Sequence, residues 1–338
     1  VAFAEDASDI LTLNVGAALG VSVDGPFAGT IAGENLVALT LAKLAAAEPL
    51  IQETFAEASD VLGYDLWKLS QEGPEDAMAL TERTQPLMLT AGVATWRVWR
   101  KHGGAMPPAM AGHSLGEYSA LVAAEAVDFR TAVGLVQFRG QSMQQAVPPG
   151  QGGAAAILGI DDAEVEAACR EAAQGEVVLP ANFNSPGQVE NAGASAAVDR
   201  AIAACQARGA KRAIKLALSV PVHTSLMQPA ADRMRTRLAA AQFHPSNVRE
   251  LYTVEVRKHG GPDEIRAALV EQIVKPVRWT ETVQAMLAAG ARIIIECGPG
   301  RVLTGLNRRI EKNRDIAMLA IEDPETLQQA LAACQVQS

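Results

Sequence analysis

A serine between two glycines is the part of this chain best suited to chemistry. The segment Gly112-His113-Ser114-Leu115-Gly116 has the pattern G-x-S-x-G, and it separates an apolar approach from a helical run that we expect over Ser114 to Ala126. This order predicts a nucleophile elbow, a sharp turn that exposes a serine hydroxyl at the start of a helix. The first-turn N–H groups of that helix would stabilise negative charge that develops beside the serine. An ordinary strand–helix turn is the alternative interpretation.

A serine hydroxyl becomes a good nucleophile only when a neighbouring base takes its proton. The chain has five histidines, three of which we expect in solvated loops: His102, His244 and His259. His113 adjoins the serine, and because neighbouring side chains diverge we expect it to support the site without reaching the hydroxyl. His223 lies where an apolar strand passes into a helix, a place where α/β folds put working residues. His223 is therefore the candidate base, and a purely structural histidine is the alternative.

An arginine falls on the apolar face of a predicted helix over residues 129–147. Arg139 follows Val136 by three residues and precedes Met143 by four, so it lies on the stripe that faces the interior. A buried guanidinium is costly unless it is paired. One interpretation is an internal Asp or Glu partner. The other is a substrate carboxylate that binds both arms of the guanidinium.

The pattern along the chain predicts an α/β protein. With 338 residues, 49% of them hydrophobic, the chain has material for two packed units or one large one. Helical segments alternate with short apolar runs, which favours a parallel sheet covered by helices. Residues 48–62 and 84–102 read as helices, and residues 292–296 read as a buried strand before the turn Gly298-Pro299-Gly300.

A smaller unit is expected between residues 150 and 219. Its predicted order is strand, helix, strand, strand, helix, strand, which is the ferredoxin-like order. The strands are expected over 153–158, 177–181, 188–192 and 211–218, and the helices over 162–173 and 194–208. The large domain would then comprise residues 1–149 and 220–338.

Composition excludes several classes of function. The net charge of −9 disfavours nucleic acid as a partner, since phosphate binding needs a basic surface. No apolar run reaches the length of a membrane span. The four cysteines have neither a disulfide framework nor the spacing of metal ligands, and no basic residue precedes Lys43 as a signal peptide would require. We therefore expect a cytoplasmic protein without a metal site.

Several segments together resemble one known family, the malonyl-CoA:acyl-carrier-protein transacylases of fatty-acid synthesis. The resemblance covers residues 48–322. It is carried by Gly112 to Leu121, Thr84-Gln85-Pro86, Asn182 to Gln188, Val220-Pro221-Val222-His223 and Gly298-Pro299-Gly300. It implies a hydrolase-like large domain and transfer of a malonyl group from malonyl-CoA to the phosphopantetheine thiol of acyl carrier protein. The transfer would pass through a malonyl-serine intermediate, without a metal or redox cofactor.

The resemblance also implies roles for individual residues. Ser114 would be the nucleophile and His223 the base, oriented by the backbone carbonyl of Gln272, while Arg139 would bind the malonyl carboxylate. The remaining residues expected to contact the substrate or its oxyanion are Leu115, Gly33, Glu34, Gln85 and Asn182. Two segments depart from the family pattern. Residues 31–36 read I-A-G-E-N-L where the family has P-G-Q-G-S-Q, and residues 250–255 read E-L-Y-T-V-E where it has a V-x-N-N-V-D-like strand.

Three other functions remain open at this point. A stand-alone acyltransferase of polyketide synthesis would carry nearly the same residues. A serine thioesterase or esterase would share the serine and histidine but release the acid to water. A carrier-binding protein without catalysis is the third. For an acidic carrier, we expect docking at Lys211-Arg212 or Arg308-Arg309.

Overall fold

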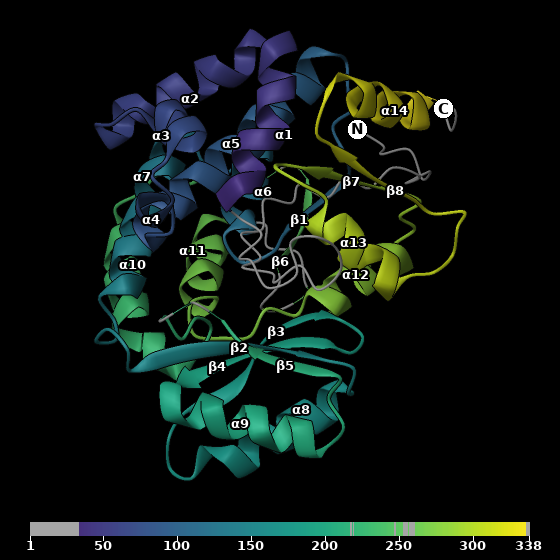
Figure 1. Ribbon diagram of the computed structural model, residues 1–338. Coiled ribbons are helices and arrows are strands. Elements are labelled where there is room, and N and C mark those ends of the chain that lie inside the picture. Colours follow the sequence, from purple (N-terminus) through teal and green to yellow (C-terminus); the bar gives the residue numbers. More distant parts are fainter. Residues whose placement is uncertain are drawn as a thin grey trace.

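A computed structural model describes residues 34–335, apart from residues 217, 219, 247, 253–255 and 257–260. Its helices and strands form a mixed α/β architecture in which a small four-stranded sheet lies at one end of a larger body (Figure 1). Within the described residues, no helix is both long enough and apolar enough to cross a membrane.

Helices begin the described chain. They are α1 (Glu34–Ala47), α2 (Pro49–Leu62), α3 (Leu66–Glu72), α4 (Glu75–Met78) and α5 (Thr81–Lys101). Pro49 begins α2, where a missing N–H costs nothing, and Gly63 ends it in the left-handed conformation, as the sequence predicts. His102 is exposed in the turn that follows α5, as expected, and it also contacts Glu48. Its Nε2 lies 2.6 Å from Oε1 of Glu48, so it ties the end of α5 to the start of α2.

The elbow lies between β1 (Ala109–Gly112) and α6 (Gly116–Ala123), and α7 (Phe129–Gln144) follows. The expectation that this helix begins at Ser114 is wrong by two residues. Ser114 has a φ of 51°, in the left-handed region that no right-handed helix contains, and the chain becomes helical only at Gly116. The strained residue is thus the serine itself.

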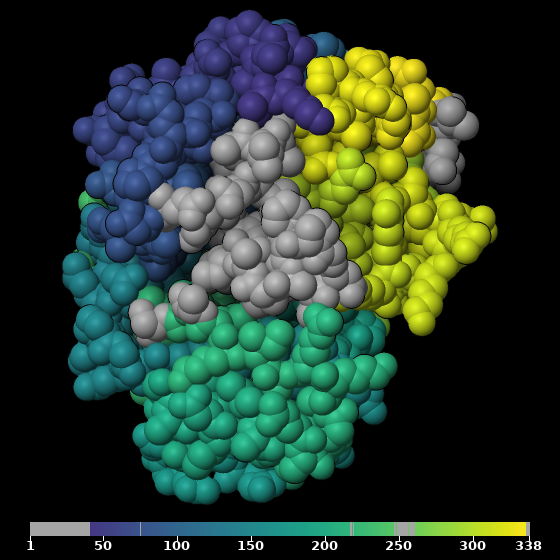
Figure 2. Space-filling view, viewed as in Figure 1, coloured from purple at the N-terminus to yellow at the C-terminus, as the bar shows by residue number. Residues whose placement is uncertain are grey.

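The small sheet follows in the chain. Its elements are β2 (Gly152–Leu158), α8 (Asp162–Ala173), β3 (Val178–Ser185), β4 (Gln188–Ala194), α9 (Ser195–Ala207) and β5 (Arg212–Lys215). The strands are antiparallel to their neighbours in the order β3-β4-β2-β5. This segment forms one contiguous block of the surface (Figure 2). The last strand is shorter than the 211–218 expected from the sequence.

The two faces of this sheet are both buried. On β2, Ala155 and Ile157 pack with α8 and α9 on one face. Ala154 and Ala156, which alternate with them, belong to a second cluster on the opposite face together with Leu216. Figure 1 shows the two helices on the outer side of the sheet and the larger body on the other. Since successive side chains of a strand point to opposite faces, the sheet is the middle layer of this end of the molecule.

The chain then returns to the larger body. Its elements there are the 3₁₀ turn Ser225–Met227, α10 (Gln228–Ala239), β6 (Arg249–Tyr252), α11 (Pro262–Glu271), α12 (Trp279–Ala288), β7 (Ile293–Cys297), α13 (Val302–Ile310), β8 (Ala317–Ile321) and α14 (Pro324–Gln335). Among the described residues, β6 pairs with β1 and β7 pairs with β8, both in parallel. The expected parallel pairing is therefore present as two pairs of strands. All five residues of β7 are buried, in line with the strand expected over 292–296.

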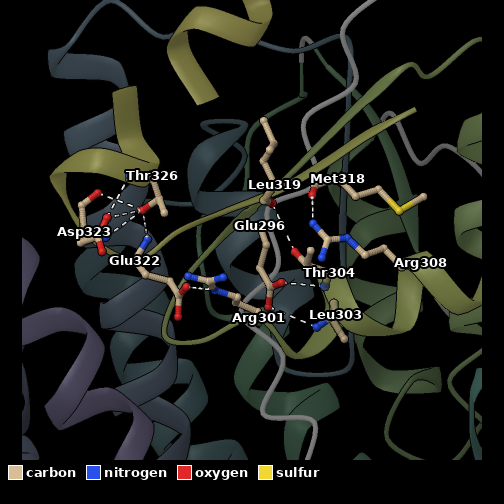
Figure 3. A network of polar contacts seen from close by, with 10 residues as sticks. All are labelled: Glu296, Arg301, Leu303, Thr304, Arg308, Met318, Leu319, Glu322, Asp323 and Thr326. Carbon is tan, nitrogen blue, oxygen red and sulfur yellow. Dashed lines mark hydrogen bonds and ion pairs between the residues drawn. The ribbon is translucent and has the colours of Figure 1, made fainter. Parts of the chain in front are cut away.

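The turn Gly298-Pro299-Gly300 places a carboxylate at the start of a helix. Glu296 of β7 is buried, and its two carboxylate oxygens accept the N–H groups of Leu303 at 3.2 Å and Thr304 at 2.7 Å (Figure 3). These N–H groups belong to the first turn of α13, which has no acceptors of its own for them. The negative charge also interacts favourably with the positive end of the helix dipole. The glycine-rich turn is thus a structural joint between β7 and α13.

Helices α5 and α7 approach each other closely at one glycine, which provides a test. A Cβ on Gly140 would lie 2.5 Å from the backbone oxygen of Thr81, whereas a Cβ on Gly134 of the same helix would meet nothing closer than 3.9 Å. We expect Gly140→Ala to lower the free energy of unfolding by about 1–3 kcal/mol through overpacking. Urea unfolding monitored by circular dichroism measures the change.

Gly134→Ala is the matched control. Alanine favours a helix over glycine by about 0.8–1.0 kcal/mol, so this variant is expected to be as stable as the parent or more stable. Equal stabilities of the two variants would contradict the close approach of α5 and α7 at Gly140.

Candidate functional site

The turn that carries Ser114 depends on glycine at Gly112. A Cβ at that position would lie 1.9 Å from the backbone carbonyl carbon of Gly116, a separation that no real side chain allows. The N–H of Gly116 donates to the carbonyl of His113 at 2.9 Å, and the N–H of Glu117 donates to that of Ser114 at 3.1 Å. The turn is therefore closed tightly by backbone hydrogen bonds, and it holds Ser114 in a conformation that is costly for a residue with a side chain.

The structure brings Ser114 and His223 together. Their Oγ and Nε2 atoms are 2.8 Å apart, although the two residues are separated by 109 positions in the chain. His223 also has a positive φ, of 58°. The hydroxyl of Thr224 donates to the carbonyl of Pro221 at 2.7 Å, which fixes the turn around the histidine. Both members of the pair are buried.

The proton on His223 is placed by a backbone carbonyl. Nδ1 lies 2.7 Å from the backbone oxygen of Gln272. Because that oxygen can only accept, Nδ1 carries the proton, and Nε2 is free to accept from the serine hydroxyl. Burial and, to a smaller extent, the positive charge of Arg139 lower the pKa of His223 to about 3. The imidazole is therefore neutral at physiological pH, the state that can take a proton from Ser114.

Arg139 reaches the same place from α7. Its Nη2 donates to Ser114 Oγ at 3.3 Å and to the side-chain Oε1 of Gln272 at 2.8 Å, while Nη1 donates to Oε1 of Gln85 at 2.9 Å. Burial lowers the pKa of the guanidinium, and Tyr118 and Glu117 oppose that effect electrostatically. The hydrogen-bond acceptors are thus amide and hydroxyl oxygens. Because the amides are neutral, they do not cancel the positive charge of the arginine, which lies beside the nucleophile.

Gln272 contributes more than its backbone. Its side-chain Nε2 donates to the backbone oxygen of Ser114 at 2.7 Å, while Oε1 accepts from Arg139. One residue at the end of α11 therefore contacts the proposed nucleophile, base and cation. The family resemblance implied a role only for the backbone carbonyl, and no periodicity in the sequence points to a side-chain role for a single glutamine.

The other expected site residues lie in different surroundings, and not all of them contact the Ser114–His223 pair or Arg139. Gln85 lies on α5 against Arg139, with Nε2 also 3.6 Å from the sulfur of Met143. Leu115 directly precedes α6, where N–H groups lack helical acceptors. Glu34 is the first residue of α1, and Gly33 lies outside the described residues. The side chain of Asn182 is bonded to Glu190 and has no hydrogen bond to the Ser114–His223 pair. The expected roles of these residues stay predictions.

A neighbouring asparagine was missed by the sequence analysis. Asn184 Oδ1 lies 2.8 Å from Nε2 of His113, the residue before the nucleophile. Both side chains are buried. The only available signal was that Asn184 belongs to the same motif as Asn182, two positions later.

The arrangement supports one class of chemistry. A hydroxyl paired with a neutral imidazole can attack an acyl carbonyl and form a covalent ester. A guanidinium fixed within 3.3 Å of that hydroxyl suits an acyl group that carries a negative charge close to its carbonyl carbon. The site is thus suited to acyl transfer of a short, anionic acyl group.

Comparisons with known proteins agree with this class. The family model of the acyl transferase domain matches residues 37–322. The chain is 53% identical to a malonyl CoA-acyl carrier protein transacylase of Escherichia coli O157:H7 over 291 residues, covering 86% of this chain and 94% of the relative. A relative with the same description from Bacillus subtilis is 39% identical over 284 residues, covering 84% and 89%.

Two solved structures are similar along nearly the whole chain. The malonyl CoA-acyl carrier protein transacylase of Coxiella burnetii has a TM-score of 0.88 at 41% identity and covers 96% of this chain and 97% of its own. A malonyl-transacylase solved in complex with a type II PKS acyl-carrier protein also has a TM-score of 0.88, at 46% identity, with coverage of 96% and 100%.

The buried neutral state of His223 predicts how stability depends on pH. The ordinary pKa of histidine is 6.5, and the folded pKa is about 3, so between these values the unfolded chain binds more protons. The stability of the folded protein that depends on a neutral His223 is fully present above pH 6.5 and is lost as the pH falls from 6.5 towards 3. A full pH unit in this range costs about 1.4 kcal/mol for one such histidine.

His223→Gln removes that titration. Chemical denaturation at several pH values between 6 and 4 should show the free energy of unfolding falling less steeply in the variant, by about 1.4 kcal/mol per pH unit. Equal slopes would mean that the imidazole is not held neutral in the folded protein.

Proposed function

The chain belongs to the acyl transferase domain family and, within it, to the malonyl CoA-acyl carrier protein transacylases, and on that premise we propose that Ser114 carries the malonyl group as an ester between the two substrates. The protein transfers a malonyl group from malonyl-CoA to acyl carrier protein. The observation that supports the serine route is the 2.8 Å contact between Ser114 Oγ and His223 Nε2 beside Arg139.

The proposed first half-reaction loads the serine. His223 Nε2 takes the hydroxyl proton while Oγ attacks the thioester carbonyl of malonyl-CoA. The backbone N–H of Leu115 stabilises the oxyanion. We assign the second donor to the Gly33–Glu34 segment, of which Gly33 lies outside the described residues. The C–S bond then breaks, His223 protonates the departing CoA sulfur, and a malonyl ester remains on Ser114.

The second half-reaction reverses these steps with another thiol. The phosphopantetheine thiol of the carrier gives its proton to His223 and attacks the ester carbonyl. The C–O bond to Ser114 breaks, the serine recovers its proton from His223, and the malonyl thioester leaves on the carrier. Because CoA departs before the carrier reacts, the kinetics are ping-pong.

We propose that Arg139 selects the malonyl group by its carboxylate. In a malonyl thioester one methylene separates the carboxylate from the carbonyl under attack. A guanidinium nitrogen 3.3 Å from Ser114 Oγ is close enough to bind that carboxylate while the carbonyl meets the hydroxyl. Gln85 and Gln272 orient the planar group by accepting from its two arms. Gln85 and Asn182 remain proposed substrate contacts.

The architecture is proposed to follow the division expected from the sequence. Residues 1–149 and 220–338 would form a hydrolase-like catalytic domain. Residues 150–219 would form a ferredoxin-like small subdomain, which the antiparallel order β3-β4-β2-β5 with two helices on one face supports. A cytoplasmic location is proposed because all four cysteines are free thiols, as is typical of reducing compartments.

A role in polyketide synthesis is the second candidate. It is favoured by one observation, the similarity to a malonyl-transacylase in complex with a type II PKS acyl-carrier protein. The chemistry at the serine would be the same, and only the carrier would differ. A hydrolytic function is less well supported, because the site orients His223 by a carbonyl and keeps an arginine for an anionic acyl group.

Mass spectrometry of the intact protein tests the proposed intermediate. Incubation with malonyl-CoA should add one malonyl group to the wild type and none to Ser114→Ala. Arg139→Ala should lose most malonyl adduct, because a bidentate charge-assisted contact is lost, with a fall in acylation rate on the order of 100-fold.

Acetyl-CoA is the matched control for the carboxylate. Acetyl loading lacks the anionic end, so the preference for malonyl over acetyl should collapse in Arg139→Ala. An unchanged preference would remove Arg139 from substrate selection, and a malonyl adduct on Ser114→Ala would place the intermediate elsewhere.

Carrier docking is proposed at the end of α13. Arg308 and Arg309 are exposed there, and Arg308 lines a pocket of about 510 Å³ together with Lys312, Arg314 and one acidic residue, Glu311. Acyl carrier proteins are acidic, so a local basic surface on a chain of net charge −9 would attract them.

Replacing both Arg308 and Arg309 by Ala should raise the KM for the carrier on the order of fivefold, about 1 kcal/mol, with malonyl exchange between CoA molecules unchanged. The pair Lys211→Ala and Arg212→Ala is the comparison, since both residues are also exposed. A rise in KM only in the second pair would move the docking surface to β5.

A further inference from the structure

A carboxyl group is buried in the small sheet close to the elbow. Glu190 of β4 is 6% exposed and lies directly across from Asn182 of β3. Asn182 Nδ2 donates to Glu190 Oε2 at 2.7 Å, and the side chain of Asn184 also hydrogen-bonds the carboxyl group. Burial raises the pKa of Glu190 to about 7, and the two amides oppose that shift. The amides therefore stabilise the ionised form, and no cation contributes.

A bulge in β3 directs Asn184 out of the regular ladder. Phe183 pairs with Val189 and Ser185 pairs with Gln188, so Asn184 is the extra residue between two paired positions. Such bulges re-aim a side chain. Here the amide reaches from the small sheet to His113, with Oδ1 at 2.8 Å from Nε2.

The carboxylate decides which way this amide faces. Above pH 7, where Glu190 is mainly ionised, its carboxyl group only accepts hydrogen bonds, so the NH₂ group of Asn184 points to Glu190 and its oxygen points to His113. The oxygen can only accept, so Nε2 of His113 must carry the proton and Nδ1 must not. Burial lowers the pKa of His113 to about 4, which keeps the ring neutral. A single acceptor at Glu190 thus sets the tautomer of a histidine two side chains away.

His113 connects this chain of hydrogen bonds to the nucleophile. It directly precedes Ser114, and its backbone oxygen accepts the N–H of Gly116 in the elbow. Its ring packs against Trp279, with 5.7 Å between the ring centroids. Trp279 follows Val277, whose backbone exchanges two hydrogen bonds of 2.8 Å with Ala181 and Phe183 of β3. The imidazole is therefore held by the small sheet on a polar edge and by the larger body on an aromatic face.

We propose that Glu190 is a positioning residue of the acyl-transfer site, which acts through Asn184 to hold His113 as its neutral Nε2–H tautomer and so fixes the elbow that carries Ser114. The catalytic part of this inference rests on the proposed function. A purely structural role would not need a charge, because an apolar side chain could fill this position between two strands without the cost of a buried carboxylate. The two asparagine amides offset that cost only when their NH₂ groups point to the carboxylate.

The tautomer can be observed directly by NMR of the full chain labelled with ¹⁵N at histidine. A protonated ring nitrogen resonates far upfield of a bare one, and five histidines are few enough to assign with His113→Gln. Above pH 7 we expect His113 to be protonated at Nε2 alone in the wild type. In Glu190→Val the amide of Asn184 is free to turn, so the Nδ1–H tautomer should become populated. An unchanged His113 spectrum would overturn the proposal.

Kinetics supply the second readout. In Glu190→Val the kcat of malonyl transfer should fall about tenfold, as is common when an orienting partner is removed, with the KM for malonyl-CoA nearly unchanged. Asn191→Val is the matched control, because Asn191 is the next residue of β4, is fully buried, and points to the opposite face of the strand, where its side-chain polar atoms have no hydrogen-bond partner among the described residues. It should leave both the tautomer and kcat as in the wild type. Equal losses of kcat in the two variants would reduce Glu190 to a packing role.

Glu190→Gln keeps the shape if the valine variant does not fold. Its NH₂ group replaces one acceptor, so one of the two asparagine amides loses its partner, and a smaller change in the same direction is expected. An unaltered tautomer in a folded Glu190→Gln protein would equally overturn the proposal. A wild-type protein that transfers no malonyl group would refute the proposed function, whereas the NMR comparison would still decide the role of Glu190.

Discussion

The hydrogen bond between His223 Nδ1 and the backbone oxygen of Gln272 is the interaction on which the site depends. It leaves Nε2 as the acceptor for Ser114, and it does so without a charge. A carboxylate in the same place would orient the imidazole equally well, but it would lie beside Arg139, which already donates to the side chain of Gln272 at 2.8 Å. The two charges would pair, and the arginine would no longer be available to an anionic acyl group. A neutral acceptor is what allows a base and a cation to share one small space.

The second constraint is backbone strain at both partners. Ser114 and His223 have φ values of 51° and 58°, which are unfavourable for residues with side chains. Each is held by surroundings that come from distant parts of the chain: Gly112 allows the turn to close, Gln272 of α11 contacts both residues, and Arg139 reaches in from α7. The strain is therefore maintained by tertiary packing around a buried network.

The parts of this site that follow local rules could be predicted from the sequence. The elbow was indicated by two glycines around Ser114, and Arg139 by its place on an apolar stripe that is indeed buried. Elimination among the histidines left His223, which lies beside the serine. What failed was the start of the helix, since the left-handed Ser114 follows from closing the turn and not from helix propensity. The side-chain contacts of Gln272 and the reach of Asn184 depend on an α11 terminus and on a bulge, which only the folded chain defines.

The small sheet is joined to the elbow by contacts of several kinds, and this bears on why it lies there. Asn184 contacts His113, the backbone of Val277 pairs with β3, and Arg309 of α13 donates to Gln188 of β4 at 2.5 Å. Each contact crosses between residues 150–219 and the rest of the chain. A carrier that docks on α13 would therefore contact a helix that touches the β3–β4 pair, and Glu190 is buried in that same pair. The β3–β4 hairpin therefore contacts both the residue before the nucleophile and the helix proposed to bind the carrier. The small sheet thus packs against the site and lies next to the proposed docking surface.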